Sequence, residues 1–176
     1  MQMDEGMDTG PILCQRRLAI GPAETAAELT PRLAALGAEL LLESLPAIAN
    51  GELKPVTQNE AEVTLAPILK REDGQVDWSM TAQQIENRRR GFTPFPGCYT
   101  LLAGQRLEII SGEPHEADSA GSAGTIIEVG RESFTVACGA GTRLSVTSVQ
   151  PAGKRAMAVR DFLNGAKLKA GDRFDS

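Results

Sequence analysis

The chain has few of the residues on which disulfide, zinc and hydrolase sites depend. It holds three widely separated cysteines, Cys14, Cys98 and Cys138, and one histidine, His115, in 176 residues. An odd, scattered set of cysteines fits neither a disulfide framework nor a zinc site, whose ligands come in close pairs. This usage indicates a reduced, cytoplasmic setting. A Ser-His-Asp or Cys-His mechanism would depend on His115, so we expect neither covalent hydrolase chemistry nor a bound metal.

Long apolar runs are also missing. No stretch approaches the roughly 20 apolar residues that a membrane span needs. The longest aliphatic run, residues 40–42, is followed directly by Glu43. The N-terminus lacks the basic region and apolar core of a signal peptide. We therefore expect no membrane partner.

Charge is distributed unevenly along the chain. The net charge is −5, and all of it arises in residues 1–72, because residues 73–176 hold equal numbers of acidic and basic side chains. Within that second part, residues 143–173 carry seven Lys or Arg against two Asp. A local basic surface in an acidic protein favours an anionic partner. An ordinary solvated face explains the same charges equally well.

Residues 4–11 form an acidic segment rich in glycine that ends in a proline. Such a segment is most often only a turn. A carboxylate held among glycines can also accept a proton during catalysis. A strand is predicted at residues 14–20. Because a loop of this kind normally follows a strand, and only three residues precede it here, we expect the upstream part of a domain to be missing.

Helical signals follow in residues 25–51. Thr25 and Glu28 fit a capping box, in which each side chain bonds the other residue's backbone amide. Pro31 and Pro46 argue against one straight helix, so two helical pieces are predicted, ending at residues 50–51. Leucines recur at helical spacing and form one apolar stripe: Leu29, Leu33, Leu36 and Leu40.

Residues 53–74 show neither helical nor strand periodicity and are predicted to be an extended connector. After it, Thr81 and Gln84 fit a second capping box for a helix that ends at Gly91. Residues 111–124 are predicted to be a loop, and residues 159–164 a last short helix. Five β-rich segments between glycine turns indicate a small antiparallel barrel of the OB kind. These segments are 98–102, 106–110, 125–129, 133–138 and 143–149.

Two basic segments could contact nucleic acid. Arg88–Arg90 precede Phe92 and Phe95, which could stack on bases, although a role in the core is the interpretation we favour for both rings. Lys154 and Arg155 lie in a turn that could grip phosphates, or could simply be a solvated hairpin. No motif for base-specific readout of DNA or RNA is present.

Three stretches resemble the methionyl-tRNA formyltransferase family: 1–13, 77–97 and 150–165. The first also resembles other folate-dependent formyltransferases, while the last two are more selective. Two positions depart from the family pattern. Met7 stands where leucine is usual, and Phe95 stands where tryptophan is frequent.

The resemblance implies transfer of a formyl group from 10-formyltetrahydrofolate to the amino group of initiator methionyl-tRNA. It implies that Asp8 is the catalytic aspartate. It also implies that one loop holds the folate, formed by Asp4, Glu5, Gly6, Met7, Asp8 and Thr9. The family's Asn and His, in an Asn-x-His arrangement, would lie upstream of this chain. We therefore expect the chain alone to be a truncated, inactive fragment of a cytoplasmic enzyme.

The fold implied is α+β. Residues 1–53 would be the tail of an α/β formyltransferase domain, residues 54–72 a linker, and residues 73–176 an OB-like barrel that binds tRNA. The proposed phosphate contacts are Lys70, Arg71, Arg88, Lys154 and Arg155. A monomer is expected for the complete enzyme, while the apolar stripe could make this chain self-associate. A free-standing tRNA-binding module, or another folate-dependent formyltransferase, remains an alternative.

Overall fold

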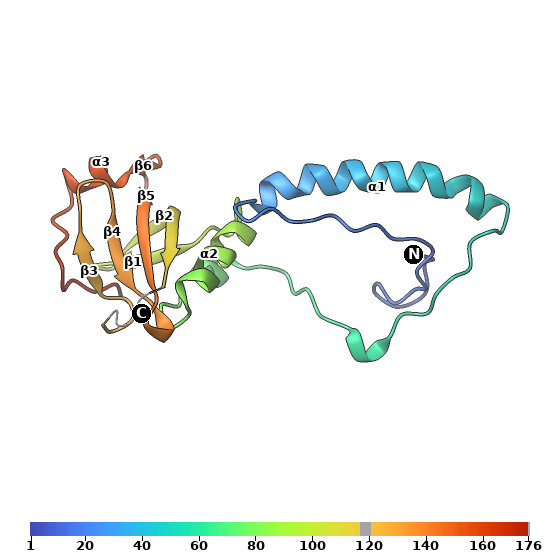
Figure 1. Cartoon of the computed structure of the whole chain (residues 1–176), viewed down its shortest axis with the longest axis horizontal. Coiled ribbons are helices and arrows are strands. Elements are labelled where there is room, and N and C mark those ends of the chain that lie inside the picture. Colours follow the sequence, from blue (N-terminus) through green and yellow to red (C-terminus); the bar gives the residue numbers. More distant parts are fainter. Residues whose placement is uncertain (117–120, 176) are drawn as a thin grey trace. The chain divides into compact units, whose positions relative to one another are not determined.

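A long helix and a curled sheet belong to two separate units of the chain. The structure, a computed structural model, describes residues 1–116 and 121–175. Its two units are Met1–Ile68 and Leu69–Ser176, here the N-terminal and C-terminal units. Figure 1 shows the helix α1 in the first and the sheet in the second.

The N-terminal unit is built around α1, Ala26–Ala49. The predicted capping box is confirmed: the Glu28 amide donates to Thr25 Oγ1 and the Thr25 amide to Glu28 Oε2, at 3.4 and 2.9 Å. The prediction of two helical pieces is wrong, because Pro31 and Pro46 both lie inside the one helix. Since these prolines lie near its two ends, the stretch between them keeps its hydrogen-bond ladder unbroken.

The predicted strand at residues 14–20 is not formed. An extended segment needs a partner for its backbone groups, and the bridge nearest to these residues, between Ile12 and Val56, ends before them. A short 3₁₀ helix, η1 (Glu60–Glu62), follows, capped by the Asn59 side chain.

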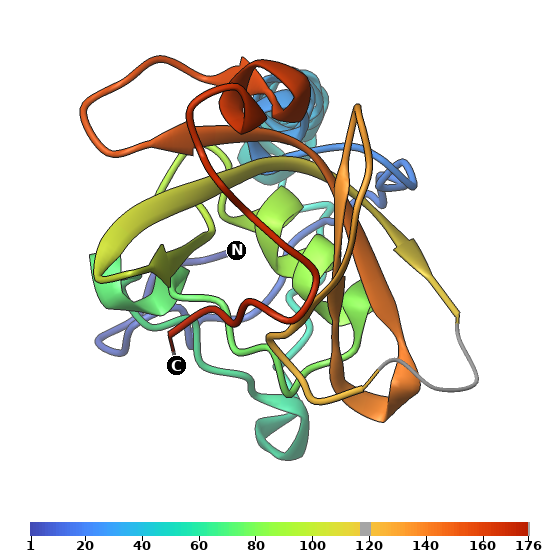
Figure 2. The same cartoon turned by 90° about the vertical axis from the view of Figure 1, so that its left-hand side faces the viewer.

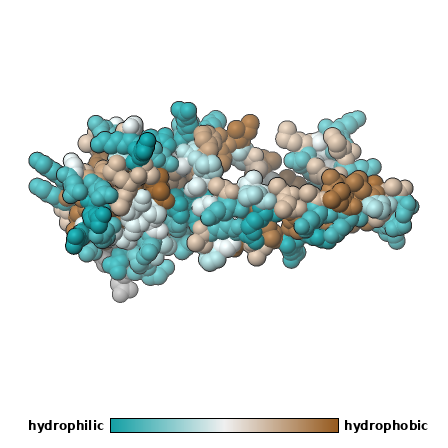
Figure 3. Space-filling view, turned by 90° about the horizontal axis from the view of Figure 1, so that it is seen from above, coloured by the Kyte–Doolittle hydropathy of each residue, from teal (hydrophilic) through white to brown (hydrophobic). Residues whose placement is uncertain are grey.

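This unit has almost no interior. Among residues 1–68, all of which the structure describes, only Gly10 and Ser44 are buried. Leu29, Leu36 and Leu40 of the predicted stripe are half-buried, whereas Leu33 is exposed. Figure 3 accordingly shows hydrophobic surface in the N-terminal unit.

The C-terminal unit is an OB-like half-barrel. Its six strands form one antiparallel sheet in the order β1-β2-β5-β4-β3, with β6 beside β5, and Figure 2 shows the sheet curling around a common interior. The strands are β1 (Tyr99–Leu102), β2 (Gln105–His115), β3 (Ile126–Val129), β4 (Phe134–Ala137), β5 (Arg143–Pro151) and β6 (Met157–Ala158). The helices are η2 (Arg71–Gly74), α2 (Ala82–Gly91), η3 (Gly139–Gly141) and α3 (Val159–Leu163).

The five predicted strands are confirmed to within a few residues, except at the end of β2. This strand continues to His115 through a bulge, pairing with β5. The predicted loop at 111–124 is therefore wrong for residues 111–115, and residues 117–120 lie outside the described residues. The short strand β6 was not predicted. The second capping box is confirmed, since the Gln84 amide donates to Thr81 Oγ1 and the Thr81 amide to Gln84 Oε1.

The core lies between this sheet and the elements that cover it. Every buried hydrophobic residue in the described part of the chain falls between Val76 and Phe174. Trp78 is 5% exposed, and its indole N–H donates to Thr100 Oγ1 at 3.1 Å. β4 and β5 supply Phe134, Val136 and Val146, and all four residues of β4 are buried, so this strand is covered on both faces.

Residues 171–175, here the closing strip, cross the open side of the half-barrel. The strip bridges β1 through the Asp175 amide, which donates to the Leu101 carbonyl at 2.9 Å. On the other side the Gly171 amide donates to the carbonyl of Ile126, in β3. Phe174 stacks on Trp78 with centroids 5.4 Å apart, which fixes the strip to the core.

Candidate functional site

Residues 4–10, here the site loop, close on themselves through Asp4. The Asp4 carboxylate accepts hydrogen bonds from the Gly6 amide at 3.1 Å and from Thr9 Oγ1 at 2.7 Å. A short side chain that binds backbone two residues ahead forms an Asx turn, so Asp4 shapes the loop. A Cβ built on Gly6 would overlap Thr9 Oγ1, which explains the glycine.

Asp8 lies at the exposed tip of this loop in a left-handed conformation, with φ 56°. Aspartate tolerates this region better than most residues. The Asp8 carbonyl accepts a hydrogen bond from Gln58 Nε2 at 2.8 Å, and the same nitrogen donates to the Gly10 carbonyl at 2.7 Å. Gly10 is buried, and a Cβ there would overlap the Gln2 carbonyl oxygen.

The structure thus gathers the six predicted folate-loop residues in one exposed loop. Some backbone groups of this loop already have hydrogen-bond partners within the chain, namely the Gly6 amide and the Asp8 carbonyl. In the described part of the chain, no hydrogen bond engages the backbone of Glu5 or Met7. Their amides and carbonyls are therefore open to a ligand.

Two of the five predicted phosphate contacts, Lys70 and Arg88, hydrogen-bond to Asp73, and a third, Arg71, is the first residue of the same short helix η2. The Lys70 amide donates to Asp73 Oδ2 at 2.6 Å, and Arg88 Nη2 donates to the Asp73 carbonyl at 2.9 Å. Arg88 also lies over the Phe92 ring, 5.0 Å from its centroid, and is half-buried. The side chains of Lys70 and Arg71 are exposed. Arg88 is therefore partly used by the fold, whereas the other two are free to meet an anion.

Lys154 and Arg155 lie in the exposed turn between β5 and β6. The turn is held by the Lys154 amide, which donates to the Pro151 carbonyl, and by Gln150 Nε2, which donates to the Lys154 carbonyl at 2.9 Å. Gly153 has φ 71°, a value suited to glycine. No described contact joins this pair to the cations around Asp73.

The two phenylalanines that follow Arg88–Arg90 have different environments. Phe92 packs against the core, as predicted. Phe95 is 52% exposed, so its predicted role in the core is wrong. The cause lies in the turn 92–97, whose Gly97 amide donates back to the Phe92 carbonyl and leaves Phe95 at the turn's outer side. His115, expected in a loop, is an exposed residue at the end of β2.

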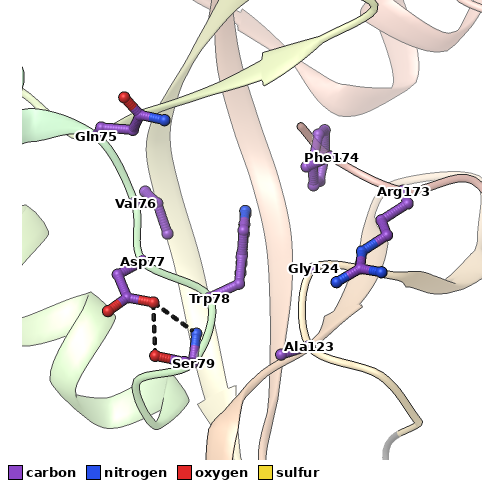
Figure 4. A pocket seen from close by; sticks show the side chains of 9 residues that line it. All are labelled: Gln75, Val76, Asp77, Trp78, Ser79, Ala123, Gly124, Arg173 and Phe174. Carbon is purple, nitrogen blue, oxygen red and sulfur yellow. Dashed lines mark hydrogen bonds between the residues drawn. The ribbon is translucent and has the colours of Figure 1, made fainter. Parts of the chain in front are cut away.

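A pocket of about 420 Å³ lies in the C-terminal unit, beside Trp78 and Phe174 (Figure 4). Arg173 and Asp77 line it. Asp77 accepts from Ser79 Oγ at 2.6 Å and from the Ser79 amide at 2.9 Å, and these bonds lower the pKa of the Asp77 carboxyl. The Trp78 ring stacks on Phe174, and its indole N–H donates to Thr100. This side of the pocket is therefore formed by residues that hold the core together.

Among residues 1–116 and 121–175, no cluster of His, Cys, Asp or Glu is arranged to hold a metal ion. In the same residues no helix is both long and apolar enough to cross a membrane.

Sequence reasoning missed Gln58 and Arg106. Gln58 lies in the aperiodic connector, where no spacing singles it out. Arg106 lies over the Tyr99 ring at 3.9 Å, and its carbonyl accepts from the Ala152 amide beside the basic turn. Its place next to that turn follows from the β2–β5 register, which the sequence does not reveal.

Comparison with known proteins gives relatives over nearly the whole chain. The profile of the family "Formyl transferase, C-terminal domain" matches residues 68–167. A methionyl-tRNA formyltransferase of Myxococcus xanthus is 46% identical over 98% of this chain and 54% of its own length. One of Koribacter versatilis is 43% identical over 98% of this chain and 54% of its own. The chain thus spans about half the length of the curated relatives it matches.

Solved structures show the same fold at lower identity. HypX from Aquifex aeolicus is similar with a TM-score of 0.59 and 18% identity, covering 98% of this chain and 34% of its own. WlaRD, described as a sugar 3N-formyl transferase and solved with dTDP and 5-N-formyl-THF, is similar with a TM-score of 0.58 and 19% identity. That match covers 87% of this chain and 53% of WlaRD.

Proposed function

The chain belongs to the formyl transferase family through its C-terminal domain, and from this membership we propose that it serves the formylation of initiator methionyl-tRNA. The observation that carries the proposal is 46% identity, over 98% of the chain, to a protein named methionyl-tRNA formyltransferase. Translation initiation takes place in the cytoplasm, and we place the protein there.

The proposed chemistry assigns a proton-handling role to Asp8. The methionine amine must lose a proton as it attacks the formyl carbon of 10-formyltetrahydrofolate, and a carboxylate within hydrogen-bond reach can take that proton directly or orient its acceptor. Asp8 is exposed at the tip of the site loop, where a substrate can reach it. The open backbone groups of Glu5 and Met7 suit a ring system that is bound through main-chain contacts.

The reaction also needs a donor for the tetrahedral oxyanion. The family resemblance assigns this work to an Asn and a His, and this chain's single histidine, His115, belongs to the C-terminal unit. We therefore propose that residues 1–53 complete a catalytic domain only with a polypeptide segment that carries those partners. Residues 54–72 then connect it to a tRNA-binding domain at 73–176.

A formylation assay tests this proposal. The chain is mixed with 10-formyltetrahydrofolate and methionyl initiator tRNA, alone and with the separately produced N-terminal half of the Myxococcus xanthus relative. We expect no turnover alone, turnover with the added half, and a loss of roughly 10²-fold or more on Asp8→Asn. Turnover by the chain alone, or none with the added half, would refute it.

We further propose that the C-terminal unit binds tRNA by itself, because it holds all the buried hydrophobic core that the structure describes. The contacts are Lys70, Arg71, Arg88, Lys154 and Arg155, acting on phosphates. Lys154→Gln and Arg155→Gln together remove two phosphate contacts. The slope of the logarithm of the association constant against the logarithm of the salt concentration should then become less negative by about 1.4–1.8.

The matched control removes the same charge elsewhere in the unit, with Lys167→Gln and Lys169→Gln, which are also exposed. The control should leave the slope nearly unchanged. Equal changes for the two pairs would show that net charge alone, and no local surface, governs binding.

A further inference from the structure

Gln58 ties the connector to the site loop across fifty residues of sequence. Its Nε2 donates to the carbonyl oxygens of Asp8 and Gly10, at 2.8 and 2.7 Å. A primary amide carries two N–H donors, so one side chain can hold both carbonyls at once. We propose that Gln58 is a positioning residue for formyl transfer, holding Asp8 in its working orientation. This inference rests on the proposed role of Asp8.

Backbone register brings Gln58 to this place. Ile12 and Val56 exchange both backbone hydrogen bonds, at 2.8 and 2.9 Å, in an antiparallel bridge. Gly10 lies two residues before Ile12 and Gln58 two residues after Val56, so the same antiparallel register sets Gln58 opposite Gly10. In extended chain, residues two apart point to the same side. The bridge therefore places Gln58 beside Gly10, where its side chain reaches the carbonyls of the loop.

The two hydrogen bonds act on the part of the loop that orients Asp8. The Asp8 carbonyl belongs to the peptide plane that follows its Cα, so fixing that oxygen limits rotation at the residue. Asp8 has φ 56°, which the loop must maintain against the preference of a residue with a side chain. Asp4 restrains the neighbouring Thr9 and Gly6 from within the loop. Gln58 supplies the restraint from outside it.

A positioning role affects catalysis differently from a substrate contact. Gln58 reaches the backbone of the loop, so its loss should leave binding of tRNA intact while misaligning the Asp8 carboxylate. A misplacement of about 1 Å can lower a rate by roughly 10²-fold. We therefore expect a fall in kcat with little change in KM for methionyl-tRNA.

The test compares Gln58→Leu and Gln58→Glu with Gln15→Leu. Glutamate keeps the length of glutamine but offers no donor to the carbonyls. Gln15 is an exposed glutamine of the same unit and makes no hydrogen bond in the described part of the chain, so it controls for the Gln-to-Leu change. The first readout is NMR of the 176-residue chain, following the carbonyl ¹³C shifts of Asp8 and Gly10. Both shifts should change in the two Gln58 variants and stay constant in the control.

The second readout is formylation by the chain completed with the N-terminal half of the Myxococcus xanthus relative. Both Gln58 variants should lose about tenfold or more in kcat, with KM for methionyl-tRNA within about twofold of the unmodified chain. Unchanged NMR shifts, or an unchanged kcat, would overturn the inference alone. Absence of turnover even with the unmodified chain would instead overturn the proposed function, and this inference with it.

Discussion

Truncating Phe174 to alanine should open the half-barrel. The ring is 3% exposed, stacks on Trp78 at 5.4 Å and meets Phe134 at 6.0 Å, so its loss leaves a cavity between two aromatic rings. Phe-to-Ala changes in cores cost about 3–5 kcal/mol of unfolding free energy. Small domains have only about 5–15 kcal/mol in total. Phe174→Ala should therefore remove a large part of the stability of the C-terminal unit.

Urea unfolding measures the effect. With an m-value of about 1–3 kcal/mol/M, a loss of about 3–5 kcal/mol should lower the midpoint by roughly 1–5 M. Far-UV circular dichroism follows the sheet, and the fluorescence of Trp78, the single tryptophan, follows the closing strip. Phe95→Ala is the matched control, because Phe95 is 52% exposed and should cost about 0.5 kcal/mol or less. If the two variants lost the same free energy, the closing strip would not hold the barrel.

Three further outcomes are expected. Burial raises the pKa of the Cys98 thiol to about 11 and that of Cys138 to about 12. The unfolded chain ionises these thiols above pH ~8.5, so the free energy of unfolding should be unaffected by them below that pH. It should fall by up to about 1.4 kcal/mol per pH unit per thiol between that pH and the folded pKa of each thiol. A Cys98→Ala, Cys138→Ala variant should show a flatter pH dependence in urea unfolding over this range. A thiol reagent at pH 8 should label only Cys14 in the native chain, because Cys98 and Cys138 are buried; mass spectrometry locates the label, and fast labelling of either buried thiol would contradict the fold. Amide hydrogen exchange should be faster in α1 than in β4 and β5, since residues 1–68 bury no hydrophobic side chain, and equal protection would refute this.

Local signals predicted the elements whose determinants lie close together in sequence. The Thr25–Glu28 and Thr81–Gln84 boxes were both found, because a capping box involves residues only three apart. The strand at 14–20 was predicted wrongly because its formation depends on residues far away in the sequence. A strand exists only with a partner, and its propensity alone does not supply one.

In the candidate site, too, features set by neighbouring residues could be predicted, and features set by distant residues could not. The site loop could be predicted as one loop because the six residues proposed to bind folate are consecutive in the sequence. The role of Gln58 could not be predicted, because its contact with Asp8 spans fifty residues and depends on the Ile12–Val56 bridge. Arg88 could be recognised as a cation but not as one that is shared with Asp73 and Phe92, since those contacts arise only after α2 has packed.

The closing strip also has a consequence for aggregation. β1 and β3 are the two edges of the main sheet order, and the strip bonds to both of them. An uncovered edge strand presents free N–H and C=O groups that can pair with another chain. When residues 171–175 detach, β3 and the Leu101 end of β1 are uncovered together, while the Tyr99 end of β1 stays paired with residues 75–76. Pairing of these strands with another chain therefore requires the detachment of one short segment, and the rest of the sheet need not unfold.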